Sequence, residues 1–202
     1  MKKNQRKNAF TLIELLTVIA IIGVLLAMLF PAIKSVMAKA EATKAQTSIS
    51  GLATAFRAYY TEYGKWPISD VKGPEIYDVT TPLYGILKGE NINITVGTAI
   101  YQGNPRNIVF LEFKAADLVS PSINTTNFVD PWKQVYHCTF DVGYVNQVPD
   151  PFMAHNALPI PCPGPGCINA GFIVWSAGPD GQYDANGDVP PSAANKDNIK
   201  SW

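Results

Sequence analysis

Hydrophobic residues fill an unbroken stretch near the start of the chain. From Leu15 to Ile33 there is no charged residue, and about 20 apolar residues are enough for an α-helix to cross the hydrocarbon core of a bilayer. This stretch therefore predicts a transmembrane helix. The apolar sequence begins earlier, at Phe10, and contains one carboxylate, Glu14. An acidic side chain within a membrane span is costly and usually functional, so Glu14 is expected to have a partner.

Beyond Pro31 the pattern changes, because apolar residues now recur at steps of three and four with charged residues between them. That period is typical of an amphipathic helix with one face on a core. We expect the helix to run from Phe10 to about Tyr63 and to stop at Gly64, with a bend or local melting at Gly23 and Pro31. The residues expected to face the core are Ile33, Val36, Met37, Ala40, Ile49, Leu52, Ala53, Phe56, Tyr60 and Tyr63.

The remaining chain shows weaker and shorter patterns. Residues 68–107 are rich in Gly, Pro, Asn and Thr, which predicts loops with at most a short helix near Leu83–Leu87. Residues 142–171 are too dense in proline for regular structure. Three short runs of β-branched and aromatic residues predict a small antiparallel sheet laid on the amphipathic helix, in an α+β fold. These runs are Ile108–Phe113, Val135–Phe140 and Phe172–Trp175.

Charge sets the expected orientation of the predicted span. Lys2, Lys3, Arg6 and Lys7 precede it without any acidic residue, and such a basic flank stays in the cytoplasm. A secretory signal would have a shorter apolar region and a small-residue cleavage site. A plain signal anchor fits the hydropathy but leaves Glu14 unexplained. The globular part is therefore expected outside the cytoplasm.

The sequence Phe10-Thr11-Leu12-Ile13-Glu14-Leu15-Leu16, after a Lys-rich leader and before the apolar run, resembles the class III signal of type IV pilins and type II secretion pseudopilins. The resemblance implies that a prepilin peptidase cleaves between Ala9 and Phe10, although the family usually has Gly where this chain has Ala9. It also implies N-methylation of Phe10 and a pairing of Glu14 with the terminus of a neighbouring subunit. The implied parts are a leader (1–9), a transmembrane assembly helix (10–33) and a periplasmic pilin-like domain (34–202).

Two internal stretches are similar to the major pseudopilin of type II secretion. They are the sequence from Tyr59 to Pro67 and the tripeptide Asp130-Pro131-Trp132. The resemblance implies a subunit of a periplasmic pseudopilus, with minor pseudopilins, an inner-membrane assembly platform and membrane lipid as partners. The alternative with the same fold is a type IV pilin for adhesion, motility or DNA uptake.

The C-terminal segment is rich in oxygen donors and glycine, which suits Ca²⁺ because this ion takes about six to eight oxygen ligands. A solvated acidic turn is the other interpretation, and the spacing does not fit an EF-hand. The segment resembles the ending of the major pseudopilin, in which a Gly-x-Asp-Gly turn and a late Asp bind one calcium. The candidate ligands are Asp180, Asp184, Asn186, Asp188 and Asp197.

The three cysteines allow two interpretations. Cys162 and Cys167 flank a Pro-Gly loop and could close a small disulfide ring in an oxidising compartment. Zinc is the weaker alternative, because His137 and His155 are scattered and zinc needs four ligands at ordered spacing.

Two further classes of function are disfavoured. Without the four basic leader residues the chain has 12 basic and 16 acidic residues, which gives no support for nucleic-acid binding. A membrane-anchored enzyme is a third hypothesis, but no nucleophile–base pair, carboxylate pair or phosphate-binding loop supports it. The protein is therefore expected not to be an enzyme.

Overall fold

The computed structural model describes residues 11–68, 76–96, 99–123, 125–152, 162–164, 166–183 and 195–202. Its longest element is helix α1 (Leu12–Tyr63). The helix is continuous through Gly23 and Pro31, so the expectation of local melting there was wrong. A proline removes one intrahelical hydrogen bond, and this loss does not interrupt a helix of 52 residues. The C-terminal end is as predicted, because Gly64 has a φ of 67° and its N–H donates to the carbonyl of Tyr60 at 2.8 Å.

The chain divides into two units, which are residues 1–40 and 41–202. In the first unit the large apolar side chains between Leu12 and Leu29 are between 46% and 86% exposed. In the described part of the chain, α1 is the helix that is long and apolar enough to cross a membrane. Ile33, Val36 and Met37 are also exposed, so their predicted core positions were wrong. The apolar face of α1 that enters the core begins at Ala45.

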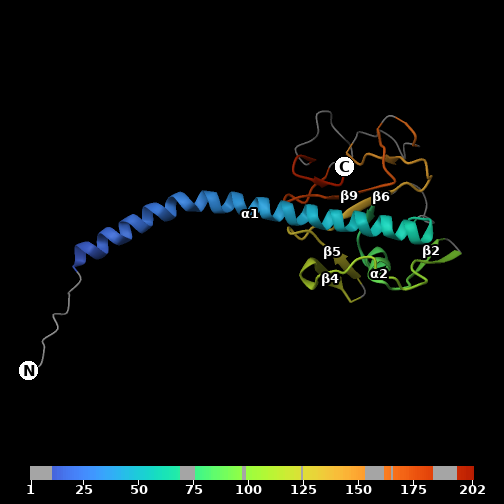
Figure 1. The fold of residues 1–202 in the computed structure, drawn as a ribbon, viewed down its shortest axis with the longest axis horizontal. Coiled ribbons are helices and arrows are strands. Elements are labelled where there is room, and N and C mark those ends of the chain that lie inside the picture. The colour runs from blue at the N-terminus through green and yellow to red at the C-terminus, as the bar shows by residue number, and fades with distance from the viewer. Residues whose placement is uncertain are drawn as a thin grey trace, which may run out of the picture. The chain divides into compact units, whose positions relative to one another are not determined.

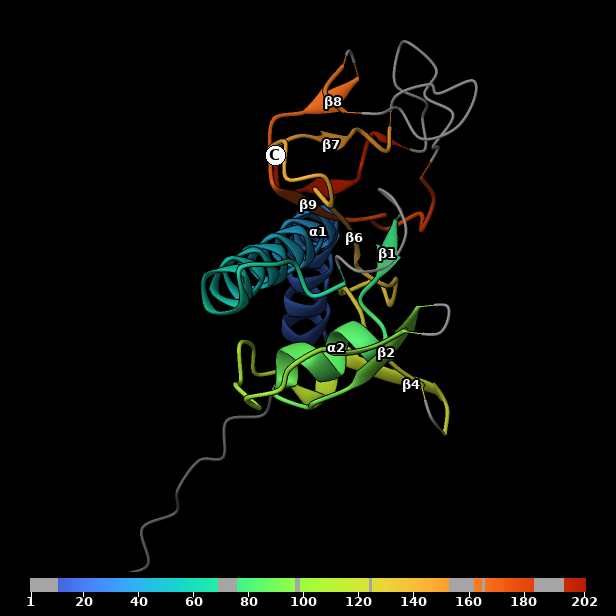
Figure 2. The same ribbon diagram turned by 90° about the vertical axis from the view of Figure 1, so that its right-hand side faces the viewer.

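The second unit contains an antiparallel four-stranded sheet in the order β1-β6-β9-β10, beside the C-terminal half of α1 (Figures 1 and 2). This arrangement confirms the predicted α+β fold of a long helix followed by small antiparallel sheets. Two of the three predicted strands are present, the first of them beginning two residues later than expected. The strands are β1 (Tyr77–Asp78), β6 (His137–Phe140), β9 (Phe172–Ser176) and β10 (Ile199–Lys200).

Strand β9 is buried along its whole length, because each of its faces has its own core. Phe172 and Val174 pack in the main core with Phe56 of α1. Ile173 and Trp175 point the other way, into a smaller core with Phe152 and Val148. The alternation of side chains along a strand produces this division.

The main core is formed by one face of α1 and the elements around it. Leu52 and Phe56 are fully buried, and Phe56 makes edge contacts with Phe140 and Phe172 at centroid distances of 4.9 and 5.5 Å. Near the end of the helix Tyr59, which is 0% exposed, takes the core position expected for Tyr60. The buried residues that α1 contributes are Ala45, Ile49, Leu52, Ala53, Ala55, Phe56 and Tyr59.

Smaller elements flank the sheet and the helix (Figure 2). Helix α2 forms where a short helix was expected and ends at Gly89, which is in the left-handed region with a φ of 104°. Hairpins not predicted from the sequence form on both sides of the main sheet. These elements are α2 (Thr81–Lys88), β2 (Asn93–Val96) with β3 (Ala99–Gln102), the 3-10 turn η1 (Ala115–Asp117), β4 (Leu118–Ser122) with β5 (Thr125–Phe128), and β7 (Val148–Pro149) with β8 (Cys167–Ile168).

The strand predicted at residues 108–113 is absent, and this prediction was wrong. The N–H groups of Phe110 and Leu111 both donate to the carbonyl of Leu87, at 2.9 and 3.1 Å. The segment therefore forms hydrogen bonds with a carbonyl in the last turn of α2 instead of pairing with a strand. Its apolar residues reflect packing, because Phe110, Leu111 and Phe113 lie against the main core. The insert expected to be irregular, residues 142–171, contributes the short β7–β8 pair.

Candidate functional site

The start of α1 is held by a reciprocal pair of contacts between Thr11 and Glu14. The backbone N–H and the hydroxyl of Thr11 both donate to Oε2 of Glu14 at 2.8 Å, and the N–H of Glu14 reaches the Thr11 hydroxyl at 3.3 Å. This is a capping box, in which two side chains satisfy N–H groups that the first turn leaves unpaired. The Thr-x-x-Glu spacing was visible in the sequence, but its capping role was not foreseen.

The carboxylate of Glu14 therefore accepts hydrogen bonds from Thr11, but no positive charge neutralises it among the described residues. Both contacts from Thr11 use Oε2. Glu14 is exposed, and the neighbouring side chains of the helix are mostly apolar. The predicted cleavage and methylation positions, Ala9 and Phe10, lie outside the described residues.

The Asp-Pro-Trp tripeptide is organised around the buried carboxylate of Asp130, which is 2% exposed. Its Oδ1 accepts from the N–H groups of Trp132 and Gln134 at 2.9 and 2.8 Å. Its Oδ2 accepts from the hydroxyl of Ser176 at 2.5 Å. Burial raises the pKa of Asp130, and the hydrogen bonds from Ser176, Gln134 and Trp132 act in the opposite direction. Asp130 therefore ties the turn before β6 to the end of β9.

The same tripeptide also reaches α1 and the last loop. The indole N–H of Trp132 donates to Glu41 at 3.1 Å. Ser176, the partner of Asp130, accepts a hydrogen bond from the N–H of Gly178 at 3.0 Å. Asp130-Pro131-Trp132 thus connects the first turns of α1 in the second unit with the loop that leaves β9.

Strand β10 closes that last loop at its base. Ile199 pairs with Ser176, and the N–H of Ser201 donates to the carbonyl of Val174 at 3.0 Å. Inside the loop Gly178 has a φ of 73°, and a Cβ placed there would lie 2.5 Å from the carbonyl oxygen of Asp197. Asp197 is therefore packed directly against the Gly-Pro-Asp-Gly turn.

The two predicted calcium ligands that are described differ in environment. Asp197 has a buried Oδ1 without a hydrogen-bond partner among the described residues. Asp180 is exposed and its Oδ1 accepts from the N–H of Gln182 at 2.9 Å. The described residues contain no group of three His, Cys, Asp or Glu side chains that could hold a metal. The other three predicted ligands, Asp184, Asn186 and Asp188, lie outside the described residues.

The cysteines are divided between a disulfide and a buried thiol. Cys162 and Cys167 are joined by a disulfide, so their sulfurs are not thiolate ligands. Cys138 is free and buried in β6, and burial raises the pKa of its thiol well above the usual value. His137 pairs with Asp78 at 2.7 Å, and His155 lies outside the described residues. This arrangement does not support the zinc interpretation.

Comparisons with known proteins show what the N-terminal segment is similar to. Residues 4–30 match the model of the prokaryotic N-terminal methylation motif. The type IV major pilin protein PilE1 of Neisseria gonorrhoeae is 37% identical over 87 residues, which are 38% of this chain and 53% of the pilin. The chain is homologous to type IV pilins over part of its length. A fimbrial protein of Neisseria meningitidis is 35% identical over 86 residues, 38% of this chain and 51% of the relative.

A third relative, the type IV major pilin protein PilA of Myxococcus xanthus, is 36% identical over 63 residues, 31% of this chain and 29% of that pilin. The chain spans about half the length, or less, of these relatives. No solved structure matches the chain. The chain thus carries an N-terminal methylation motif, is homologous to type IV pilins over part of its length, and has one described helix long and apolar enough to cross a membrane. The specific assignment to type II secretion stays a prediction.

Proposed function

We propose that this protein is a structural subunit that polymerises through α1 into a filament based in the inner membrane, with its globular unit in the periplasm. The observation that supports this most strongly is the surface of α1 from Leu15 to Leu29, which carries no charged residue and whose large apolar side chains are exposed. Such a helix is stable only in lipid or against other apolar helices. The homology to type IV pilins supports packing against copies of the same chain.

Assembly, in this proposal, follows removal of residues 1–9 by a prepilin peptidase and N-methylation of Phe10. The new ammonium group of one subunit meets the Glu14 carboxylate of its neighbour. A pairing of this kind relieves the cost of a lone charge in an apolar environment. The exposed carboxylate of Glu14 supports this, since the contacts from Thr11 use only Oε2.

Mass spectrometry of the N-terminus tests the first step. The chain is expressed with and without a prepilin peptidase, and the membrane fraction is analysed. We expect an N-methylated Phe10 terminus only when the peptidase is present. A chain that still begins at Met1 beside an active peptidase would contradict the proposal.

Among filaments of this class, we propose the pseudopilus of type II protein secretion, with minor pseudopilins and an inner-membrane assembly platform as partners. The support is the connection between Asp130-Pro131-Trp132 and the loop of Asp180 and Asp197, the regions whose sequences resemble the major pseudopilin. A type IV pilus is the second candidate, favoured by relatives that are all named as pilins or fimbrial proteins.

Deletion of the gene in its native host separates these candidates. Loss of secreted enzymes from the medium with unchanged surface pili supports the pseudopilus. Loss of sheared surface filaments or twitching with unchanged secretion supports the type IV pilus and overturns the secretion proposal.

We also propose that the last loop binds one Ca²⁺. The orphaned, buried Oδ1 of Asp197 supports this, because an unpaired carboxylate oxygen is otherwise expensive to bury. Asp197 and Asp180 would hold the ion together with Asp184, Asn186 and Asp188. The bound ion would supply positive charge that holds the loop against the base formed by β9 and β10.

A further inference from the structure

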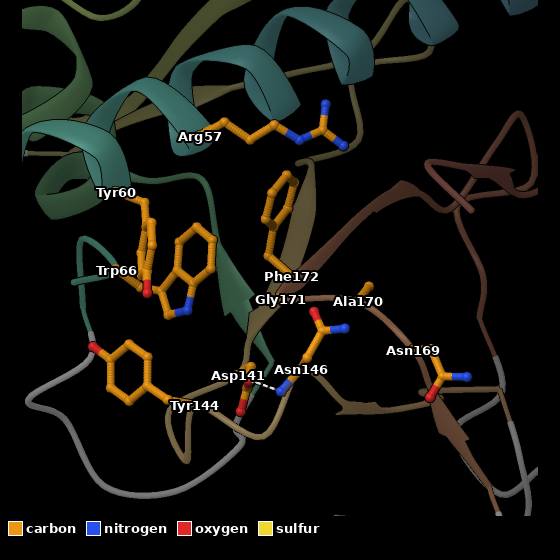
Figure 3. Close-up of a pocket in the computed structure, with 10 residues that line it drawn as sticks. All are labelled: Arg57, Tyr60, Trp66, Asp141, Tyr144, Asn146, Asn169, Ala170, Gly171 and Phe172. Carbon is orange, nitrogen blue, oxygen red and sulfur yellow. Dashed lines mark hydrogen bonds between the residues drawn. The ribbon is translucent and has the colours of Figure 1, made fainter. Parts of the chain in front are cut away.

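A cleft of about 490 Å³ lies beside the end of α1, in the second unit (Figure 3). Its wall is formed by the last turns of the helix, the segment after it, and the loops that follow β6 and precede β9. A volume of this size is within the range of small-molecule sites in proteins, about 300–1,000 Å³. Nothing in the pilin-like assembly described above uses this cleft.

Three aromatic side chains line the cleft, namely Tyr60, Trp66 and Tyr144. The rings of Tyr60 and Trp66 lie 4.4 Å apart with an interplanar angle of 31°. Tyr144 lies 6.3 Å from Tyr60 at an angle of 38°. Tyr60 is 37% exposed and Tyr144 is 49% exposed, so both rings are accessible to a ligand.

Trp66 is the fixed part of this wall. It is 7% exposed, and it packs against Gly171 so closely that a Cβ there would lie 2.7 Å from the indole ring. Its indole N–H is buried and has no hydrogen-bond partner among the described residues.

Tyr144 belongs to a loop that is held in an unusual conformation. Tyr144 and Asn146 have φ values of 54° and 57°, in the left-handed region. The carboxylate of Asp141 fixes this loop by accepting from the N–H of Asn146 at 2.6 Å. A tyrosine is rare at positive φ, where glycine is favoured, and such residues gather at functional sites.

We propose that this cleft binds a neutral sugar ring of a glycan. The C–H face of a sugar covers aromatic rings, and its hydroxyls both donate and accept hydrogen bonds. They can therefore form hydrogen bonds with the exposed amide of Asn146. The two ionisable side chains of the wall, Arg57 and Asp141, have opposite charges, so the cleft selects neither anions nor cations. A purely aliphatic ligand would make no hydrogen bond with the Asn146 amide.

Saturation-transfer NMR on the full chain tests this, in micelles of a polyoxyethylene detergent whose headgroup contains no sugar. The probes are maltotriose, cellotriose and chitotriose, with a proline-rich peptide as the other ligand class that binds aromatic grooves. For a sugar ring at the usual ligand efficiency, we expect a Kd on the order of 1 mM for at least one trisaccharide.

Two variants of the same loop locate the binding. Tyr144→Gly removes a ring at a position that glycine occupies without strain, so it should weaken sugar binding at least tenfold and leave the Tm unchanged or higher. Val145→Ala changes the neighbouring exposed residue, which does not line the cleft, and should bind as the wild type does. Tyr60→Ala gives a second loss of binding if Tyr144→Gly alters the fold.

Three results would overturn the proposal. The first is the absence of saturation transfer to every trisaccharide at a ligand concentration about tenfold above the expected Kd. The second is sugar binding that is unchanged in both Tyr144→Gly and Tyr60→Ala. The third is binding of the proline-rich peptide without binding of any sugar.

Discussion

Replacement of Asp130 by alanine should destabilise the globular unit strongly. The change leaves the N–H groups of Trp132 and Gln134 without their acceptor and removes the partner of the Ser176 hydroxyl. Each buried group left unsatisfied costs about 1–3 kcal/mol. Removal of a buried carboxylate offsets part of this cost, because burial already disfavours its charge. We estimate a net loss of about 3 kcal/mol in the free energy of unfolding.

Thermal unfolding of the full chain in detergent, followed by near-UV circular dichroism, measures this loss. In a chain of this size about 1 kcal/mol shifts the Tm by 2–4 °C, so Asp130→Ala should lower the Tm by about 6–12 °C. Asp130→Asn is the matched control, because its amide oxygen can still accept from the two N–H groups. It should remain within about 1 kcal/mol of the wild type. A Tm for Asp130→Ala equal to that of Asp130→Asn would refute the argument.

Three further predictions concern the same region. The pKa of Asp130 is raised from its ordinary value of 3.8, so the charged carboxylate destabilises the folded state above the folded pKa and has no such effect below 3.8. The free energy of unfolding of Asp130→Asn, measured in urea, should therefore increase relative to that of the wild type as the pH rises from 3.8 to neutrality. Gly178→Ala should lower the free energy of unfolding by about 1–3 kcal/mol, because Gly178 has a positive φ and the added Cβ would meet Asp197. Gly143→Ala is the control, because its Cβ would lie 3.7 Å from the nearest atom, and it should unfold as the wild type does. Calcium at a hundredfold excess over its Kd should stabilise the chain by about 2.7 kcal/mol relative to chelator, and Asp197→Ala should abolish most of this difference; equal Tm values with calcium and chelator would remove the proposed site.

Features encoded by local sequence were predicted correctly. The helix end at Tyr63 follows from Gly64, which accepts a positive φ. The strand Phe172–Trp175 follows from a continuous run of β-branched and aromatic residues, as expected for a strand buried on both faces. The first half of α1 follows from its uncharged apolar run, which is long enough for a helix that crosses a membrane.

Features that depend on distant partners could not be predicted in the same way. Residues 108–113 have the composition of a strand, yet their N–H groups meet the end of α2, which lies about twenty residues earlier in the chain. Strand β10 consists of two residues and exists because β9 offers it a free edge. Nothing near Asp130 in the sequence indicates its bond to Ser176, 46 residues away. The face of α1 that packs in the core was predicted to begin near Ile33, but it begins at Ala45. The reason is similar, since the periodicity of apolar residues does not show where the globular unit begins.

Glu14 has two proposed roles, because its charge promotes polymerisation through α1 and its side chain takes part in the capping box with Thr11. Two variants distinguish these roles. Glu14→Gln keeps the capping box, because glutamine also serves at this position, but removes the charge. Thr11→Ala removes the two hydroxyl contacts of the capping box, leaves the hydrogen bond from the backbone N–H of residue 11 to Glu14, and keeps the charge. Both variants and the wild type are expressed with a prepilin peptidase and the assembly machinery, and sheared filaments are quantified by immunoblot against membrane-inserted subunit. We predict that Glu14→Gln inserts but forms almost no filaments, while Thr11→Ala still assembles. Filament yields for Glu14→Gln equal to the wild type would contradict the account.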